Sequence, residues 1–290
     1  MKIDAHHFHR QNMGRLLYVG EYLEREGYNL NGTRFQRYLS IVNRFMENPE
    51  LTDDEAWALV ELSEMYVIVR ISERHECIGR AEISICLKGA HSLENERLAG
   101  AGNKARNYCF QLYIASNLLA FGMKAEIPTH AAEADIRFIY DRSSIPVECK
   151  RLFVNGKVEN IVKTACSQVS KRVMEEQFGI VAISLSREFW AVEKSAVMES
   201  VNDARFSVGK LYNQWRETFS RLLKRYPKVA LIYINFQVPT VGPDNLYTTY
   251  ERKFFKVRDN YKELPEAGVA QHFINGMMTL GLMEELKIND

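Results

Sequence analysis

Apolar side chains recur at helical spacing through most of the first hundred residues. The pattern predicts amphipathic helices over 14–26, 33–46 and 53–65. Thr52 and Glu55 form a capping-box pair at the start of the third helix, and Asn48-Pro49 ends the second. No chemical motif accompanies these helices. We therefore expect residues 1–98 to form a mostly helical N-terminal region.

The rest of the chain, 99–290, alternates between helical and strand patterns. Apolar periodicity predicts helices at 104–121, 157–176, 202–226 and 266–286. Short or continuous apolar runs predict strands at 134–140, 145–152, 179–186 and 228–238. This order indicates a second, α/β domain with a mixed sheet flanked by helices.

The predicted helix at 104–121 is apolar nearly all round, as expected of a buried helix. Asn107 and Gln111 are exceptions, and their four-residue spacing places them on one face. Because buried polar groups need partners, we expect Gln111 to lie near other functional groups.

The composition is that of an ordinary globular protein of 290 residues, with 46% hydrophobic and 26% charged residues. Its five cysteines show no C-x-x-C spacing, which favours reduced thiols in a cytoplasmic protein. The strongest apolar run, 229–236, is far shorter than the ~20 residues of a membrane-spanning helix. We expect a soluble protein that does not act at a membrane.

The net charge of +1 argues against a bulk polycation, but it hides an uneven distribution. Residues 1–100 carry 12 basic and 16 acidic side chains, a net of −4. Residues 201–260 carry 11 basic and 5 acidic side chains, a net of +6, interleaved with aromatic residues. Such a segment is typical of a phosphate-binding surface and equally of solvated helix faces.

The hairpin at 134–152 gathers charged side chains. A four-residue loop at 141–144 would place Asp135 opposite Lys150 and Arg137 opposite Glu148. Side chains alternate along a strand, so these four would share one side, with Cys149 facing the core. The two carboxylates are hard oxygen ligands for Mg²⁺ or Mn²⁺, which can promote phosphodiester hydrolysis. The lysine can stabilise the negative charge that develops in the transition state. The same residues also suit a solvated salt-bridge ladder.

Asp135 followed by Glu148-Cys149-Lys150, on a hairpin between two helices, resembles the PD-(D/E)xK superfamily of restriction-endonuclease-like nucleases. The resemblance covers 104–187 in order and spacing. It implies that Asp135 and Glu148 bind the metal and that Lys150 assists catalysis.

The resemblance also extends to the two flanking helices. It implies that Gln168 positions water or phosphate and that Lys171 is an accessory residue. Gln111 stands where many members carry a metal-binding Glu, so one metal is favoured over two.

The expected function is therefore metal-dependent cleavage of nucleic acid, with DNA favoured over RNA. The alternative is a nuclease-fold binding or scaffold module with an incomplete active site, which the neutral Gln111 motivates. The helical region 1–98 would then recognise substrate, regulate access, or contact a partner protein or a second copy of the chain.

Overall fold

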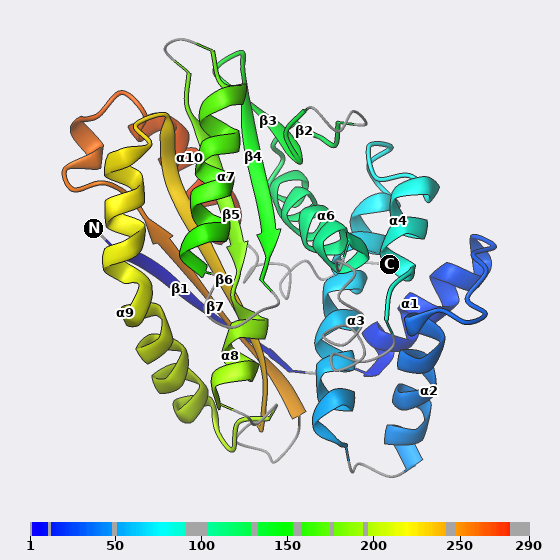
Figure 1. Cartoon of the computed structure of the whole chain (residues 1–290). Helices are drawn as coiled ribbons and strands as arrows, with labels where there is room; N and C mark the ends of the chain where they lie inside the picture. Colours follow the sequence, from blue (N-terminus) through cyan, green and yellow to red (C-terminus); the bar gives the residue numbers. More distant parts are fainter. Residues whose placement is uncertain are drawn as a thin grey trace.

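A mixed sheet of seven strands runs through the computed structural model, with helices on both faces (Figure 1). The structure describes residues 2–10, 13–47, 51–90, 104–128, 133–152, 158–174, 177–193, 197–241 and 247–278. The predicted α/β class, with a mixed sheet and a mostly helical N-terminal part, is confirmed.

The strands lie in the order β1-β7-β6-β5-β4-β3-β2. Their bounds are Lys2–Arg10 (β1), Ala125–Glu126 (β2), Ile136–Tyr140 (β3), Ser143–Arg151 (β4), Gly179–Ser184 (β5), Val229–Val241 (β6) and Tyr247–Lys256 (β7). The pairs β4–β5 and β5–β6 are parallel, and all other neighbours are antiparallel. The central strand β5 is buried along its whole length, as its continuous apolar run predicts.

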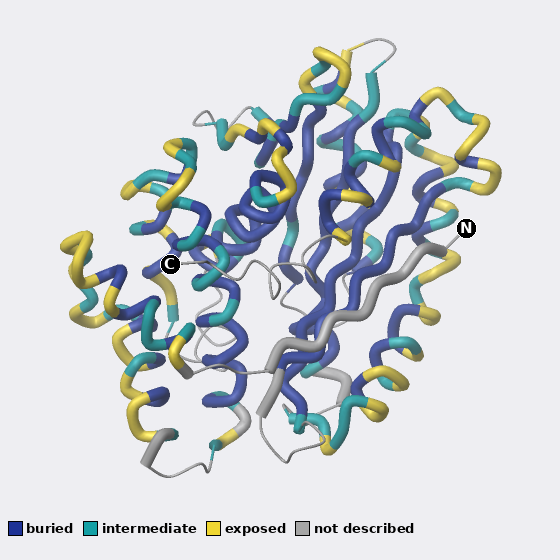
Figure 2. The backbone as a smooth tube through the Cα atoms, turned by 180° about the vertical axis from the view of Figure 1, so that it is seen from behind, coloured by how far each residue is buried: buried dark blue, intermediate teal, exposed yellow. Residues whose placement is uncertain are grey.

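The helices form two layers around the sheet. Their bounds are Met13–Arg25 (α1), Arg34–Glu47 (α2), Asp53–Ser72 (α3), Arg80–Leu87 (α4), Lys104–Ala120 (α6), Val158–Arg172 (α7), Ser186–Glu193 (α8), Val201–Arg225 (α9) and Ala267–Met278 (α10). Helices α7 and α9 lie in front of the sheet (Figure 1), and their side chains pack in one core with it. The side chains of α6 and α10 belong to a second core on the other face. Strands β5 and β6 are buried along nearly their whole length, whereas the outward turns of the helices are exposed (Figure 2).

The N-terminal part contacts the sheet in two ways, through a shared hydrophobic core and through strand pairing. Helices α1 to α4 share one hydrophobic core with α6, α10 and the rear of the sheet. The first strand, β1, pairs along β7 from Lys2 opposite Lys256 to Arg10 opposite Thr248. The region 1–98 is thus mostly helical but also supplies an edge strand, which its sequence pattern did not predict.

The β3–β4 hairpin corrects the predicted register. Its turn has two residues, Asp141 and Arg142, with φ of 45° and 65°, so Tyr140 pairs with Ser143. The expected four-residue loop is therefore wrong, and the register moves by two residues. Because side chains alternate with a period of two, an even shift leaves each side chain on its predicted face. Extending the register by one residue brings Asp135 level with Glu148 rather than with Lys150.

Candidate active site

The predicted acidic and basic side chains of the hairpin do meet in space. Lys150 Nζ lies 3.5 Å from Asp135 Oδ2 and 3.4 Å from Glu148 Oε2. Glu148 is fully buried, whereas the side chains of Asp135 and Lys150 keep 24% and 23% exposure. The lysine thus bridges one buried and one solvent-accessible carboxylate.

Asp135 is held from two sides. The backbone N–H of Cys149 donates to Asp135 Oδ2 at 2.8 Å, and the side-chain amide of Gln111 donates to the Asp135 carbonyl. Cys149 itself faces the core as predicted, and burial raises the pKa of its thiol well above the usual value. The aspartate is therefore positioned before any ligand binds.

One face of α6 supports both strands of the site. Asn107 Oδ1 accepts a hydrogen bond from the Arg151 N–H on β4 at 2.8 Å, while Gln111 holds the chain where it enters β3. These two residues are the polar exceptions in the buried helix. Gln111 lies beside the site, as expected, and its contact is to the backbone of Asp135.

On the opposite face of the sheet, α7 adds a residue that the sequence pattern did not predict. Arg172 Nη1 forms an ion pair with Glu148 Oε1. Its neighbour Lys171, expected as an accessory residue, is exposed and, within the described part of the chain, does not contact the cluster. Gln168 lies one helical turn before Arg172, and its buried Oε1 has no hydrogen-bond partner in the described part of the chain. The four-residue spacing from Gln168 is the signal that points to Arg172.

The predicted pairing of Arg137 with Glu148 is wrong. Arg137 pairs with Pro146 across the hairpin, and its guanidinium lies 3.8 Å from Glu133. The cluster therefore consists of two carboxylates, Lys150 and Arg172, with no net charge. A buried carboxylate such as Glu148 requires partners of this kind, since an isolated ion loses its hydration.

The donor set suits one hard divalent cation. Among the described residues, no group of three or more His, Cys, Asp or Glu side chains is placed to hold a metal. Mg²⁺, however, keeps several waters and is commonly bound by one or two carboxylates together with substrate phosphates. Asp135 and Glu148 fit that mode and do not fit an all-protein cage.

A second polar cluster lies behind the sheet, around Glu61 of α3. Both of its carboxylate oxygens are occupied by the groups of four residues: Arg34 (3.0 Å), Tyr38 (3.0 Å), Arg106 (2.7 Å) and Arg187 (2.7 Å). Burial alone would raise the pKa of Glu61, but the charges of Arg106, Arg34 and Arg187 outweigh it and hold the pKa well below the usual range. This cluster joins α2, α3, α6 and α8.

Arg151 belongs to this rear side as well. It is buried, its guanidinium pairs with Glu64 of α3, and it is therefore not placed to touch phosphate. Burial raises the pKa of Glu64, against the lowering effect of Arg151. Arg151 thus connects the end of β4 to helix α3 of the N-terminal part.

The basic segment at 201–260 divides into a buried and an exposed part. Lys253 on β7 is fully buried, with its Nζ 3.3 Å from Glu251 Oε2 and 2.9 Å from the Met277 carbonyl, and burial lowers its pKa. Phe254 and Phe255 are in the hydrophobic cores. Within this segment, the exposed basic residues are mainly those of α9. The cations and aromatic residues that alternate along the sequence therefore do not form one continuous surface.

No protein-family model, curated protein or solved structure matches the chain. Within the described residues, no helix combines the length and apolarity that crossing a membrane requires.

Proposed function

We propose that this protein is a metal-dependent nuclease that hydrolyses phosphodiester bonds in nucleic acid, with DNA as the first substrate to test. The observation that carries the proposal is that Lys150 Nζ lies within 3.5 Å of both Glu148 on β4 and Asp135, the residue immediately before β3. Hydrolysis of a phosphodiester builds up negative charge on the phosphate oxygens. The partly exposed ammonium group of Lys150 can stabilise that charge.

The surrounding order of elements supports a restriction-endonuclease-like fold. Helix α6 precedes the β3–β4 hairpin, and α7 and the buried parallel strand β5 follow it. That order is what the resemblance of the segment 104–187 implies. In addition, α6 and α7 each place a side chain against the hairpin, through Gln111 and Arg172.

Each residue of the candidate site would have a separate role in hydrolysis. Asp135 and Glu148 would hold Mg²⁺ or Mn²⁺, which when bound neutralises charge on the scissile phosphate and acidifies water. Lys150 Nζ orients the attacking water and stabilises the charge that develops on phosphate oxygens. Gln168 offers its unpartnered amide oxygen to that water, and Arg172 exchanges Glu148 for a phosphate oxygen.

Cleavage assays with the full chain test the proposal. Linear, circular and single-stranded DNA and RNA are incubated with Mg²⁺, Mn²⁺ or EDTA. Lys150→Ala should reduce the rate by roughly 10²- to 10³-fold, the loss typical of one electrostatic donor. Lys163→Ala, which removes an exposed lysine of α7, is the matched control and should retain activity. Cleavage that survives both Lys150→Ala and EDTA would refute this site.

A binding or scaffold module is the second candidate, and one contact favours it. The ion pair of Arg172 with Glu148 occupies one ligand oxygen, and Gln111 gives no third carboxylate. A module of this kind would bind nucleic acid in a salt-dependent manner without binding Mn²⁺. Mn²⁺ titration of wild type and Glu148→Gln separates the two, since only a metal site loses affinity on that substitution.

A further inference from the structure

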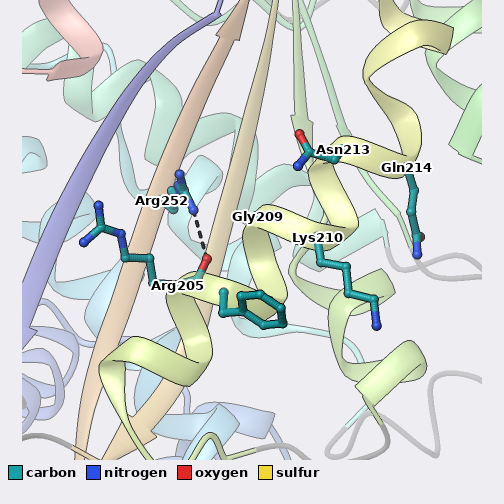
Figure 3. A pocket seen from close by; sticks show the side chains of 7 residues that line it. Arg205, Gly209, Lys210, Asn213, Gln214 and Arg252 are labelled. Atoms are coloured by element: carbon teal, nitrogen blue, oxygen red, sulfur yellow. Dashed lines mark hydrogen bonds between the residues drawn. The ribbon is translucent and has the colours of Figure 1, made fainter.

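Helix α9 presents a pocket that the proposed active site does not use. The pocket has a volume of about 770 Å³, and six of its lining residues, Arg205, Phe206, Gly209, Lys210, Asn213 and Gln214, belong to α9, while Arg252 comes from β7 (Figure 3). Among these described lining residues, three are cations and none is a carboxylate. The pocket is therefore suited to an anionic ligand.

Phe206 is 74% exposed, although α9 has a complete apolar face without it. That face packs into the front core through other side chains, among them Val208, Leu211 and Tyr212. Within α9, Phe206 is the one large apolar side chain that is exposed. An exposed aromatic ring has no packing role here, and in a basic surface it is a platform on which a base can stack.

Arg252 reaches the pocket from the strand beneath α9. Its Nη1 donates to the Arg205 carbonyl at 2.9 Å (Figure 3). A Cβ added to Gly209 would lie 3.1 Å from that Nη1, so the glycine leaves room for the guanidinium. Glycine inside a helix costs about 1 kcal/mol relative to alanine. A side chain at position 209 would therefore require the Arg252 guanidinium to shift by a few tenths of an ångström.

We propose that the α9 pocket binds the single-stranded part of a nucleic acid, with its phosphates on Arg205 and Lys210 and one base stacked on Phe206. Asn213 and Gln214 supply amide donors and acceptors at the rim. Stacking on Phe206 requires an unstacked base, which a duplex does not offer. A membrane surface would need an apolar helix face, and α9 exposes one ring among polar side chains.

This inference rests on the proposed function, because it supplies that active site with a second contact for its substrate. Helix α9 lies beside α7, and Arg221 of α9 forms an ion pair with Glu159 of α7 at 2.8 Å. Arg172 of α7 contacts Glu148. The helices that carry the pocket and Arg172 therefore pack in one core on the same face of the sheet.

Binding of short labelled oligonucleotides to the full chain in EDTA tests the pocket without requiring cleavage. Phe206→Ala should weaken binding of single-stranded DNA or RNA at least about fivefold, and Phe206→Trp should restore it. The double variant Arg205→Ala/Lys210→Ala should reduce the slope of log affinity against log salt by about 1.4, since each phosphate contact on a single strand contributes about 0.7. Lys224→Ala, which removes one exposed charge elsewhere on α9, is the matched control.

The outcomes separate this inference from the proposed nuclease function. The proposed pocket would be wrong if Phe206→Ala and the double variant bound the oligonucleotide as tightly as Lys224→Ala does. This would hold even if the protein cleaves DNA. Displacement of the oligonucleotide by anionic phospholipid vesicles that bind through Phe206 would also overturn it. Weakened binding by these variants in a protein that cleaves nothing would support the pocket and reject the nuclease.

Discussion

Two clusters of carboxylates and cations lie on opposite faces of the same sheet, and they differ in how completely they are enclosed. Glu61 is buried, and both of its oxygens are held by groups from Arg34, Tyr38, Arg106 and Arg187. Around Lys150, in contrast, only Glu148 is fully buried, and Asp135 and the lysine reach solvent.

The comparison shows that similar residues serve different purposes according to access and saturation. A carboxylate with every oxygen position occupied by fixed donors joins helices and has no position left for a ligand. A cluster with a solvent-accessible carboxylate and a long, partly exposed lysine can exchange partners for a metal or a phosphate. Substitutions in the two clusters can therefore test this difference.

Removing the charge of Glu61 should have the largest effect on stability. Glu61→Gln leaves three buried arginines without their common partner, which should cost about 3–5 kcal/mol in the free energy of unfolding. Glu159→Gln, at an exposed carboxylate of α7, should change the free energy of unfolding by less than about 1 kcal/mol. Denaturant titrations of the two variants measure this. Equal, small losses would show that the Glu61 cluster is not a structural junction.

The same cluster should give the protein a defined sensitivity to acid. Because the folded-state pKa of Glu61 is depressed, its contribution to stability is fully present above its ordinary value of 4.5. The contribution is then lost as the pH falls through the folded-state pKa. The stability difference between wild type and Glu61→Gln should therefore be constant near neutral pH and shrink only below about pH 4.5. A difference that shrinks between pH 7 and 5 would contradict the assigned cause.

An intermediate effect is expected where α7 contacts the open cluster. Arg172→Ala leaves the buried Glu148 Oε1 without its ion-pair partner and should raise Mn²⁺ affinity severalfold, because the metal then no longer competes with the arginine for that oxygen. It should also lower the cleavage rate, since the arginine can no longer contact a phosphate oxygen. Lys171→Ala, one residue away and exposed, should leave both quantities unchanged. Unchanged Mn²⁺ affinity in Arg172→Ala would show that metal and arginine do not compete.

The exposed ion pair between α7 and α9 should have the smallest effect. The side chains of Arg221 and Glu159 keep 64% and 46% exposure. Solvent and salt screen such pairs, so a double-mutant cycle with Arg221→Ala and Glu159→Ala should give a coupling of about 0.2–1 kcal/mol. A coupling as large as that expected for Glu61 would remove the distinction between enclosed and exposed clusters.

Local patterns were enough to predict the parts of the site that depend on few neighbours. The helical period around Asn107 and Gln111 placed both on one face of a buried helix, and the structure shows that both bind the strands of the site. Strand alternation likewise placed Glu148 and Lys150 together and Cys149 in the core. These relations follow from periods of 3.6 and 2.0 residues, which the sequence alone determines.

The tertiary structure decided what depends on residues far apart in the chain. Strand β1 joins β7 across more than two hundred residues, Arg172 rather than Lys171 contacts Glu148, and Arg151 is directed to Glu64. The two-residue turn at Asp141 also set the register that brings Asp135 level with Glu148. A period states which side chains share a face, but the partner on that face is chosen by packing and by the pairing of buried charges.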